Sequence, residues 1–458
     1  MKISTILKNI VKSVIVILLI AVLVCVTYSL LFGNAEKPWD GVSLQPHEKG
    51  AVYDYKYYKS QVKHDKAMIL IPGLMASSFY NAETGEPMWS VAGFGHLATT
   101  MIQKKTLEER SEYFDFVVNS LKCDENNVPL LKERIATMND GEKYATFDGM
   151  KYIYDMVYPV YGDRYDVVVW QYDWRQHNMG SAAELEKFIN YNGWKEVMFF
   201  THSMGGIVTA NYLSRSAENR AKTKLFMPFG CPFFGSMDAI NNLFEVENAS
   251  GLIADLFKAV GSYANRDFAL TDIARTLASI YELLNSPAFD SAWYFDSDSP
   301  YYIGVNGSIG NGEKYLDNAE IYELVCSFDW AKRADGSLMP AVNNLPAYWE
   351  NLYVDDGNGG KIFVADAVPT EFIVGIDVAT TIAVEINEDG KIVNKIKSAY
   401  GDGTVPAYSA SAGHPLDDPR VHLVYGVEHG PLANNNFQAT ADKSGLQYLL
   451  GILEQYIK

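Results

Sequence analysis

The chain has 458 residues, a length that allows about two to four domains or one large core with insertions. It carries 38 Lys and Arg against 56 Asp and Glu, a net charge of −18, whereas a nucleic-acid-binding protein needs a basic face. Apolar residues make up 48% of the chain, which excludes wholesale disorder. With only 4 Cys, a small fold built on disulfides is excluded as well.

The N-terminal segment, residues 1–35, is predicted to direct the rest of the chain out of the cytoplasm. Three lysines precede residues 13–32, which carry no charge and as a helix would reach about 30 Å, the thickness of a bilayer's hydrocarbon core. Two interpretations stay open: a cleaved signal peptide, or a single-pass signal anchor, which the length favours. In both, the lysines stay inside, so the remainder is expected at the outer side of the cell membrane or secreted.

Short continuous apolar runs predict strands that are buried on both faces of a mostly parallel sheet. Helical patterns lie between these runs, at residues 181–191, 205–214 and 446–456, and Ser181 with Glu184 suggests a capping box at the first of them. This alternation predicts an α/β fold in which helices flank the sheet. The six runs are residues 67–71, 165–170, 197–200, 225–229, 371–376 and 421–425.

Two long stretches, residues 80–160 and 237–368, interrupt this alternation. Structureless loops of that length are uncommon, so we expect inserted subdomains within one domain that spans residues 36–458. The second stretch has several helical patterns, and a hairpin that turns at Asp389-Gly390 is predicted after it, over residues 381–395. The predicted helices of the second stretch are residues 252–263, 272–284 and 316–332.

The sharpest chemical feature of the sequence surrounds Ser203, in the run Thr-His-Ser-Met-Gly-Gly. A buried strand leads into a tight turn and then a helix, which is the nucleophile-elbow arrangement. Gly205 and Gly206 are small enough for the strained turn, whereas Thr201 stands where Gly or Ala is usual. The turn predicts Ser203 as a nucleophile, with the helix N-terminus favouring negative charge beside it.

A serine nucleophile needs a histidine base and an acid, which follow it in that fold in the order acid, then histidine. His429 comes just after the last strand run, where a loop can aim it at the sheet edge, while His422 lies inside that run and His414 lies in a Gly-Pro loop. We therefore predict His429 as the base. Asp402, between two glycines, is the preferred acid, and Asp377 is the alternative.

The developing oxyanion needs two backbone N–H donors. Met204, immediately after the nucleophile, is predicted to supply one of them. Leu74 is predicted to supply the other, because Pro72-Gly73 ends the first buried run and starts the loop that this fold uses.

Several separated segments together resemble the lecithin:cholesterol acyltransferase family, which includes lysosomal phospholipase A2 and phospholipid:diacylglycerol acyltransferase, within the α/β-hydrolase superfamily. The resemblance covers about half of the chain, in the expected core, and the scarcity of Cys points to a microbial member. The matching segments, in the same order as in the family, are residues 71–73 (IPG), 172–175 (YDWR), 202–206 (HSMGG), 230–236 (GCPFFGS), 401–406 (GDGTVP) and 428–429 (EH).

The resemblance implies the same triad, Ser203, Asp402 and His429, and the same oxyanion donors, Leu74 and Met204. It implies an acyl-enzyme formed from a glycerolipid or phospholipid ester, with transfer of the acyl group to water or to an alcohol. It also implies that the insertion at residues 80–160 contacts membrane and that the insertion at 237–368 forms a helical lid.

Other polar residues suggest no further chemistry. Asp173 and Arg175 are interpreted as a structural pair rather than a substrate contact, and Cys231 as a small buried side chain. Acidic residues near 296–298 and 355–359 lack the spacing of a calcium loop, so no metal and no cofactor are expected.

The leading hypothesis is a serine-dependent lipid acyl hydrolase or acyltransferase that meets its lipid ester at a membrane or lipid surface. Two alternatives stay open: a serine esterase for small soluble esters, and a non-catalytic surface protein that retains the fold. Head group, chain length and oligomeric state leave no signal in the sequence.

Overall fold

The computed structural model describes residues 62–77, 79–81, 87–89, 100–131, 135–137, 150–244, 258, 260–267, 269–286, 309–310, 315–387, 389–433 and 444–457. The predicted anchor or signal peptide at residues 13–32 lies outside these ranges, as does the first part of the predicted helix at 252–263. Across the ranges described, every helix is too short or too polar to cross a bilayer.

Six strands form a parallel central sheet in the order β15-β12-β7-β6-β1-β5. Each predicted apolar run forms one of these strands, with its ends within two residues of the expected positions, so the predicted α/β class with a mostly parallel sheet is confirmed. The bounds are β1 Lys66–Ile71, β5 Asp166–Val169, β6 Glu196–His202, β7 Thr223–Phe229, β12 Phe372–Ile376 and β15 Val421–Tyr425.

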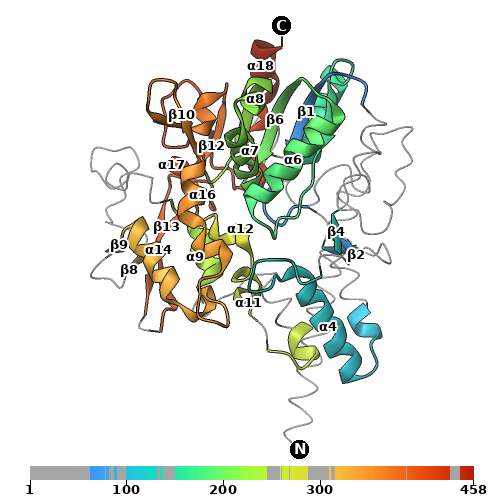
Figure 1. Ribbon diagram of the computed structural model, residues 1–458, viewed down its shortest axis with the longest axis vertical. Coiled ribbons are helices and arrows are strands. Elements are labelled where there is room, and N and C mark those ends of the chain that lie inside the picture. Colours follow the sequence, from blue (N-terminus) through green and yellow to red (C-terminus); the bar gives the residue numbers. More distant parts are fainter. Residues whose placement is uncertain are drawn as a thin grey trace, which may run out of the picture.

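Helices cover both faces of the sheet because successive strand side chains alternate between two apolar clusters. Ile69 packs with one cluster, together with α6 (Asn178–Asn192) and α7 (Met204–Arg215). Met68 packs with the other, together with α5 (Met150–Tyr161) and α18 (Leu446–Tyr456). Figure 1 shows α6 and α7 lying along the strands. α5 therefore belongs to the core, although most of it falls within the predicted insertion.

Helix α6 begins three residues before the predicted start, and the capping box predicted at Ser181 and Glu184 is wrong. Its N-cap residue is His177, whose side chain makes no capping hydrogen bond. The N–H of Asn178 instead donates to Oε2 of Glu282, at 2.7 Å. A carboxylate that is distant in sequence thus satisfies the first turn of the helix, which a local pattern cannot reveal.

The first insertion holds a small antiparallel sheet, in the order β3-β2-β4, and the helix α4 (Leu107–Leu121). Thr106 and Glu109 form a capping box at the start of α4, and the helix buries Phe114 among other residues. The three strands are β2 Phe79–Asn81, β3 Pro87–Trp89 and β4 Ile135–Thr137.

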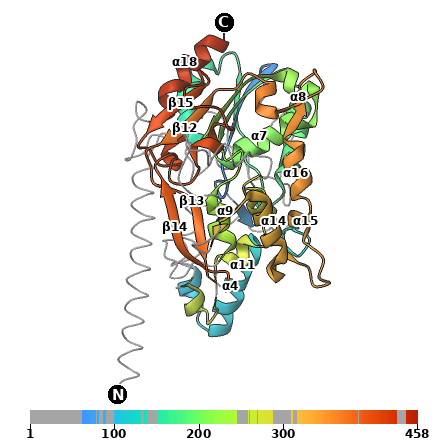
Figure 2. The same ribbon diagram turned by 90° about the vertical axis from the view of Figure 1, so that its left-hand side faces the viewer.

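Where the structure describes it, the second insertion is largely helical, as predicted, although short separate helices replace the single helices predicted at residues 272–284 and 316–332. It lies beside the hairpin of β13 (Thr380–Ile386) and β14 (Ile392–Ser398). The hairpin is confirmed, with Gly390 at a φ of 73° in its turn. Figures 1 and 2 place α4, α11, α14 and the hairpin toward one end of the molecule and α18 at the other. The elements of this insertion are α9 Met237–Leu243, α11 Thr271–Ala274, α12 Ala278–Tyr281, β8 Ile309–Gly310, β9 Tyr315–Leu316, α14 Asn318–Ser327, η1 Asp329–Ala331, α15 Pro340–Asn343, α16 Leu345–Asn351, β10 Tyr353–Asp355, β11 Lys361–Phe363 and η2 Val364–Ala367. Short elements elsewhere are α8 Ala217–Lys222, α17 Ala407–Ala410 and η3 Gly430–Ala433.

Candidate active site

Ser203 occupies the turn between β6 and α7 with a strained backbone, at φ 53° and ψ −131°. A positive φ is rare for a residue with a side chain, and such strain is concentrated at functional sites. Its N–H donates to the carbonyl oxygen of Phe229, and its own carbonyl accepts from the N–H of Gly206, both at 3.0 Å. This turn after a central parallel strand defines the α/β-hydrolase fold, as the sequence predicts.

Glycines surround Ser203 because the backbone segments meet too closely for a side chain. A Cβ on Gly205 would collide with the carbonyl oxygen of Pro72, at 2.6 Å, and with that of Ile71. A Cβ on Gly73 would lie 2.8 Å from the Cβ of Ser203 and 3.3 Å from its Oγ. The loop that follows β1 therefore reaches the Ser203 hydroxyl directly.

The residues predicted as acid and base, Asp402 and His429, are in contact. Asp402 Oδ2 lies 2.7 Å from His429 Nδ1. The Asp402 side chain is 1% exposed. Its Oδ1 accepts the backbone N–H groups of Thr404, at 3.0 Å, and Val405, at 2.7 Å, so the carboxylate has a fixed orientation. Gly230, where β7 ends, lies against this pair, because a Cβ there would be 2.8 Å from Asp402 Oδ2.

The turn at Ser203 and the loop at His429 are in direct contact through His202. The ring centroids of His202 and His429 lie 4.6 Å apart, and His202 Nε2 lies 3.0 Å from the His429 carbonyl oxygen. The structure thus brings the three predicted triad positions to one edge of the sheet, the edge at which its parallel strands have their carboxyl ends.

The two residues predicted to supply oxyanion donors, Leu74 and Met204, each follow directly after a residue at the Ser203 turn. Met204 is the first residue of α7, so its N–H belongs to the turn whose donors have no acceptor within the helix. Leu74 follows Gly73, which contacts Ser203, and the next residue, Met75, has a φ of 64°. The indole N–H of Trp89 donates to the Met75 carbonyl oxygen at 2.6 Å, which holds this loop in place.

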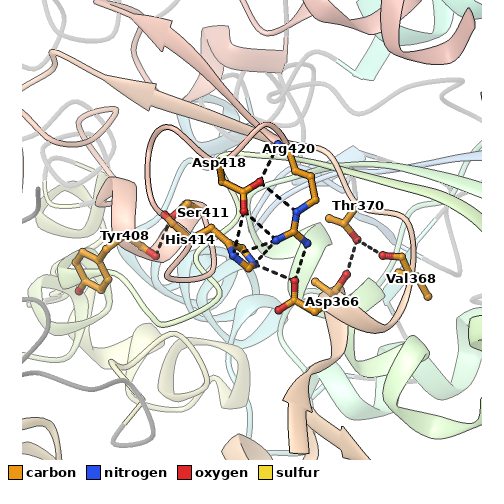
Figure 3. A network of polar contacts seen from close by, with 9 residues as sticks. Asp366, Val368, Thr370, Tyr408, Ser411, His414, Asp418 and Arg420 are labelled. Carbon is orange, nitrogen blue, oxygen red and sulfur yellow. Dashed lines mark hydrogen bonds and ion pairs between the residues drawn. The ribbon is translucent and has the colours of Figure 1, made fainter. Parts of the chain in front are cut away.

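His414, one of the alternative bases, lies in a separate polar network (Figure 3). Its Nε2 is 2.9 Å from Asp366 Oδ1, and Arg420 donates to both Asp366, at 2.8 Å, and Asp418, at 3.0 Å. Burial raises the pKa of Asp366, but the hydrogen bonds from His414 and Arg420 and the attraction of their charges together lower it more. The network joins the loop after α17 to the segment before β12, which is a structural connection.

The remaining alternatives make contacts other than those of the pair of Asp402 and His429. His422, on β15, has its Nε2 2.8 Å from Oε2 of Glu371, the residue directly before β12. Asp377 is exposed, has a φ of 66° and donates its N–H to the Ala399 carbonyl oxygen, as part of a turn.

Asp173 and Arg175 form a buried ion pair, in which Nη2 lies 2.7 Å from Oδ2 and Nε 2.8 Å from Oδ1. Nη1 of Arg175 donates to the carbonyl oxygen of Ser120, and the guanidinium lies 4.6 Å from the Phe79 ring centroid. Burial opposes both charges, but their mutual attraction and hydrogen bonds dominate, so the pKa of Asp173 is lowered. This arrangement fits the structural interpretation of the motif. Cys231 is fully buried, and burial raises the pKa of its thiol to about 12.

Two charged neighbours of the site carry no sequence signal. Asp238 lies in the first turn of α9. Burial raises the pKa of its carboxyl, and the net shift is upward although Asn241, His429 and Lys395 each lower this pKa. Burial lowers the pKa of Lys395 on β14. Acidic residues are common in the first turn of helices, so the sequence does not distinguish Asp238 from an acid that only stabilises a helix N-terminus.

Comparisons with known proteins agree with the motifs. A family model described as Lecithin:cholesterol acyltransferase matches residues 136–261, which include the Ser203 turn. No curated protein sequence matches the chain significantly. Among solved structures, the crystal structure of the Tle4-Tli4 complex is similar, at 13% identity and a TM-score of 0.45, over 86% of this chain and 100% of that chain. The predicted resemblance to the lecithin:cholesterol acyltransferase family is thus confirmed for residues 136–261, the part of the chain that the family model matches.

Proposed function

We propose that this chain is a serine-dependent lipid acyl hydrolase or acyltransferase that acts on glycerolipid or phospholipid esters. Ser203 Oγ attacks the ester carbonyl carbon while Nε2 of His429 takes its proton, and Asp402 holds the imidazole through Nδ1. The N–H groups of Leu74 and Met204 hold the oxyanion. The alcohol leaves with the proton from His429, and water or a lipid alcohol then attacks the acyl-enzyme.

One observation carries the proposal: a strained Ser203, at φ 53°, shares one sheet edge with a histidine whose Nδ1 lies 2.7 Å from a buried carboxylate. The strain costs free energy of the order of 1–3 kcal/mol, which a purely structural turn would avoid with glycine. A serine kept in this position supports a role for its hydroxyl. The family match over residues 136–261, which includes the turn, supports a lipid ester as the substrate class.

A membrane-contacting role for the first insertion is supported by its surface near the start of α4. Ile102 and Leu107 are 55% and 47% exposed, and Lys105 between them is exposed as well. Apolar side chains next to lysines suit the boundary between lipid head groups and acyl chains. We propose that this surface, together with the N-terminal segment at residues 13–32, brings an exported enzyme to lipid.

Covalent labelling tests the nucleophile. A fluorophosphonate probe should label the wild-type protein, and Ser203→Ala should abolish the label. Ser214→Ala, on the same helix but two to three turns away, is the matched control and should label fully. Asp402→Asn should lower the labelling rate by roughly 10⁴-fold because the imidazole then favours the wrong tautomer. Labelling that persists in Ser203→Ala would refute the mechanism.

Lipid chemistry tests the substrate class. We expect hydrolysis of a glycerophospholipid to rise sharply when the substrate passes from monomers to vesicles. Mass spectrometry of mixed lipids with a long-chain alcohol then separates the two outcomes, because hydrolysis yields free fatty acid and transfer yields a new ester. Equal activity on monomers and vesicles would favour a soluble-ester esterase, and a folded protein inert to the probe would favour a non-catalytic role.

A further inference from the structure

His202 contacts the loop of the proposed base in two ways, although the proposed mechanism assigns it no role. Its side chain is buried at 3% exposure, directly before Ser203 at the end of β6. Its ring lies 4.6 Å from the His429 ring with 38° between their planes. Its Nε2 lies 3.0 Å from the carbonyl oxygen of His429.

The hydrogen bond has a defined direction because a carbonyl oxygen can only accept. The Nε2 of His202 therefore carries the proton, which fixes one tautomer of the neutral ring. His202 is adjacent in sequence to the nucleophile, so this bond ties the backbone of His429 to the backbone of the Ser203 turn. Asp402 contacts the ring of His429 at Nδ1, so the ring and the backbone of this residue each have a hydrogen-bonding partner.

Such a connection bears directly on rate. The nucleophile and the base come from β6 and from the loop after β15, two segments more than 200 residues apart in the sequence. Their relative position must be fixed to a fraction of an ångström, since a misplacement of about 1 Å costs roughly 100-fold. Among the residues described, the bond from His202 is a side-chain link between the strand of the nucleophile and the residue that acts as base.

Resting on the proposed function, we propose that His202 is a positioning residue. The hydrogen bond from its Nε2 to the His429 carbonyl oxygen keeps the base aligned with Ser203. The role needs an N–H donor at that point more than it needs an aromatic ring. A residue that only filled space would work as well with a ring that cannot donate.

Two substitutions separate these roles. His202→Phe keeps the ring and removes the donor, and should lower kcat on a soluble ester by roughly 100-fold while KM stays within about two-fold. His202→Gln places an amide N–H near the position of Nε2 and should recover to within about ten-fold of the wild type. His422→Phe is the matched control, because His422 pairs with Glu371 at the opposite ends of β15 and β12 from the predicted triad, and it should leave kcat unchanged.

The outcomes distinguish this inference from the proposed function. If the wild type is not labelled by a fluorophosphonate, the proposed function fails. If the wild type is labelled and His202→Phe matches its rate, or His202→Gln is no better than His202→Phe, the positioning role fails. Should His202→Phe not fold, ¹⁵N NMR of the wild-type imidazoles decides: we expect His202 protonated at Nε2, and protonation at Nδ1 alone would overturn the proposal.

Discussion

The buried ion pair of Asp173 and Arg175 allows a quantitative test of how the core is held together. Arg175 is 1% exposed and uses three of its nitrogens, two on Asp173 and one on the Ser120 carbonyl oxygen. Arg175→Met retains the length and apolar stem of the side chain but removes the charge. The change leaves the Asp173 carboxylate buried without its counter-charge.

The expected loss follows from that uncompensated charge. Breaking a buried pair by removing one partner costs about 3–5 kcal/mol. A chain of 458 residues, at about 2.1 cal/mol/K per residue, has an unfolding entropy of about 1 kcal/mol/K. The thermal midpoint of Arg175→Met should therefore fall by about 3–5 °C. Asp173→Asn combined with Arg175→Met removes both charges and keeps a hydrogen-bond acceptor, so it should recover at least half of this loss.

Thermal unfolding by circular dichroism at pH 7 gives the midpoints, and urea unfolding gives a second measure because a chain of this length need not unfold in two states. An unchanged midpoint in Arg175→Met would refute the assigned energetics. So would a double variant no more stable than Arg175→Met. A variant with wild-type stability and a raised KM for lipid would instead favour the substrate-contact interpretation of the motif.

Two further predictions concern the pair of His177 and Glu282, which connects the second insertion to the core, and the close packing of Gly206 against Cys231. Burial lowers the pKa of His177, but the hydrogen bond to Glu282 and the attraction of its charge together raise it more. This pair should therefore stabilise the fold fully below about pH 6.5 and lose that contribution as the pH rises through the raised pKa. The thermal midpoint of the wild type should fall from pH 6 to pH 8 relative to His177→Gln, and parallel curves would contradict the pairing. Gly206→Ala should destabilise by about 1–3 kcal/mol because its Cβ would lie 2.6 Å from the Cβ of Cys231, whereas the control Gly451→Ala, with open space around it in α18, should be neutral or slightly stabilising. Equal midpoints for the two alanine variants would contradict the close packing.

The central sheet could be predicted almost completely because its strands are buried on both faces. A strand of that kind is a short continuous apolar run, and the run at β15 and the helical pattern at α18 have the bounds of the elements themselves. The same reasoning failed at the start of α6, where a residue distant in the sequence determines the helix boundary. α6 starts at Asn178 because Glu282, in another part of the fold, accepts its N–H, and no local pattern contains that partner.

The site was predictable to the extent that chain order and turn chemistry define it. Ser203 precedes Asp402 and His429 in the order that this sheet topology requires, and glycines identify both tight turns. The contacts among these segments were not predictable, since they depend on how the strands are ordered in space. His202 belongs to the motif around Ser203, yet its bond to His429 depends on how the loop after β15 reaches past β12 and β7 to the end of β6.

Thr201 shows how a departure from the usual motif is accommodated. The residue two before the nucleophile is usually small, but here its fully buried side chain places Oγ1 3.5 Å from Cys231 Sγ. The space comes from Gly206, whose absent Cβ would lie 3.3 Å from the same Oγ1 and would also collide with Cys231. The turn thus requires a small residue on the helix side rather than on the strand side. A motif search that requires glycine before the histidine would miss this chain, although Gly206 provides the space that the turn needs.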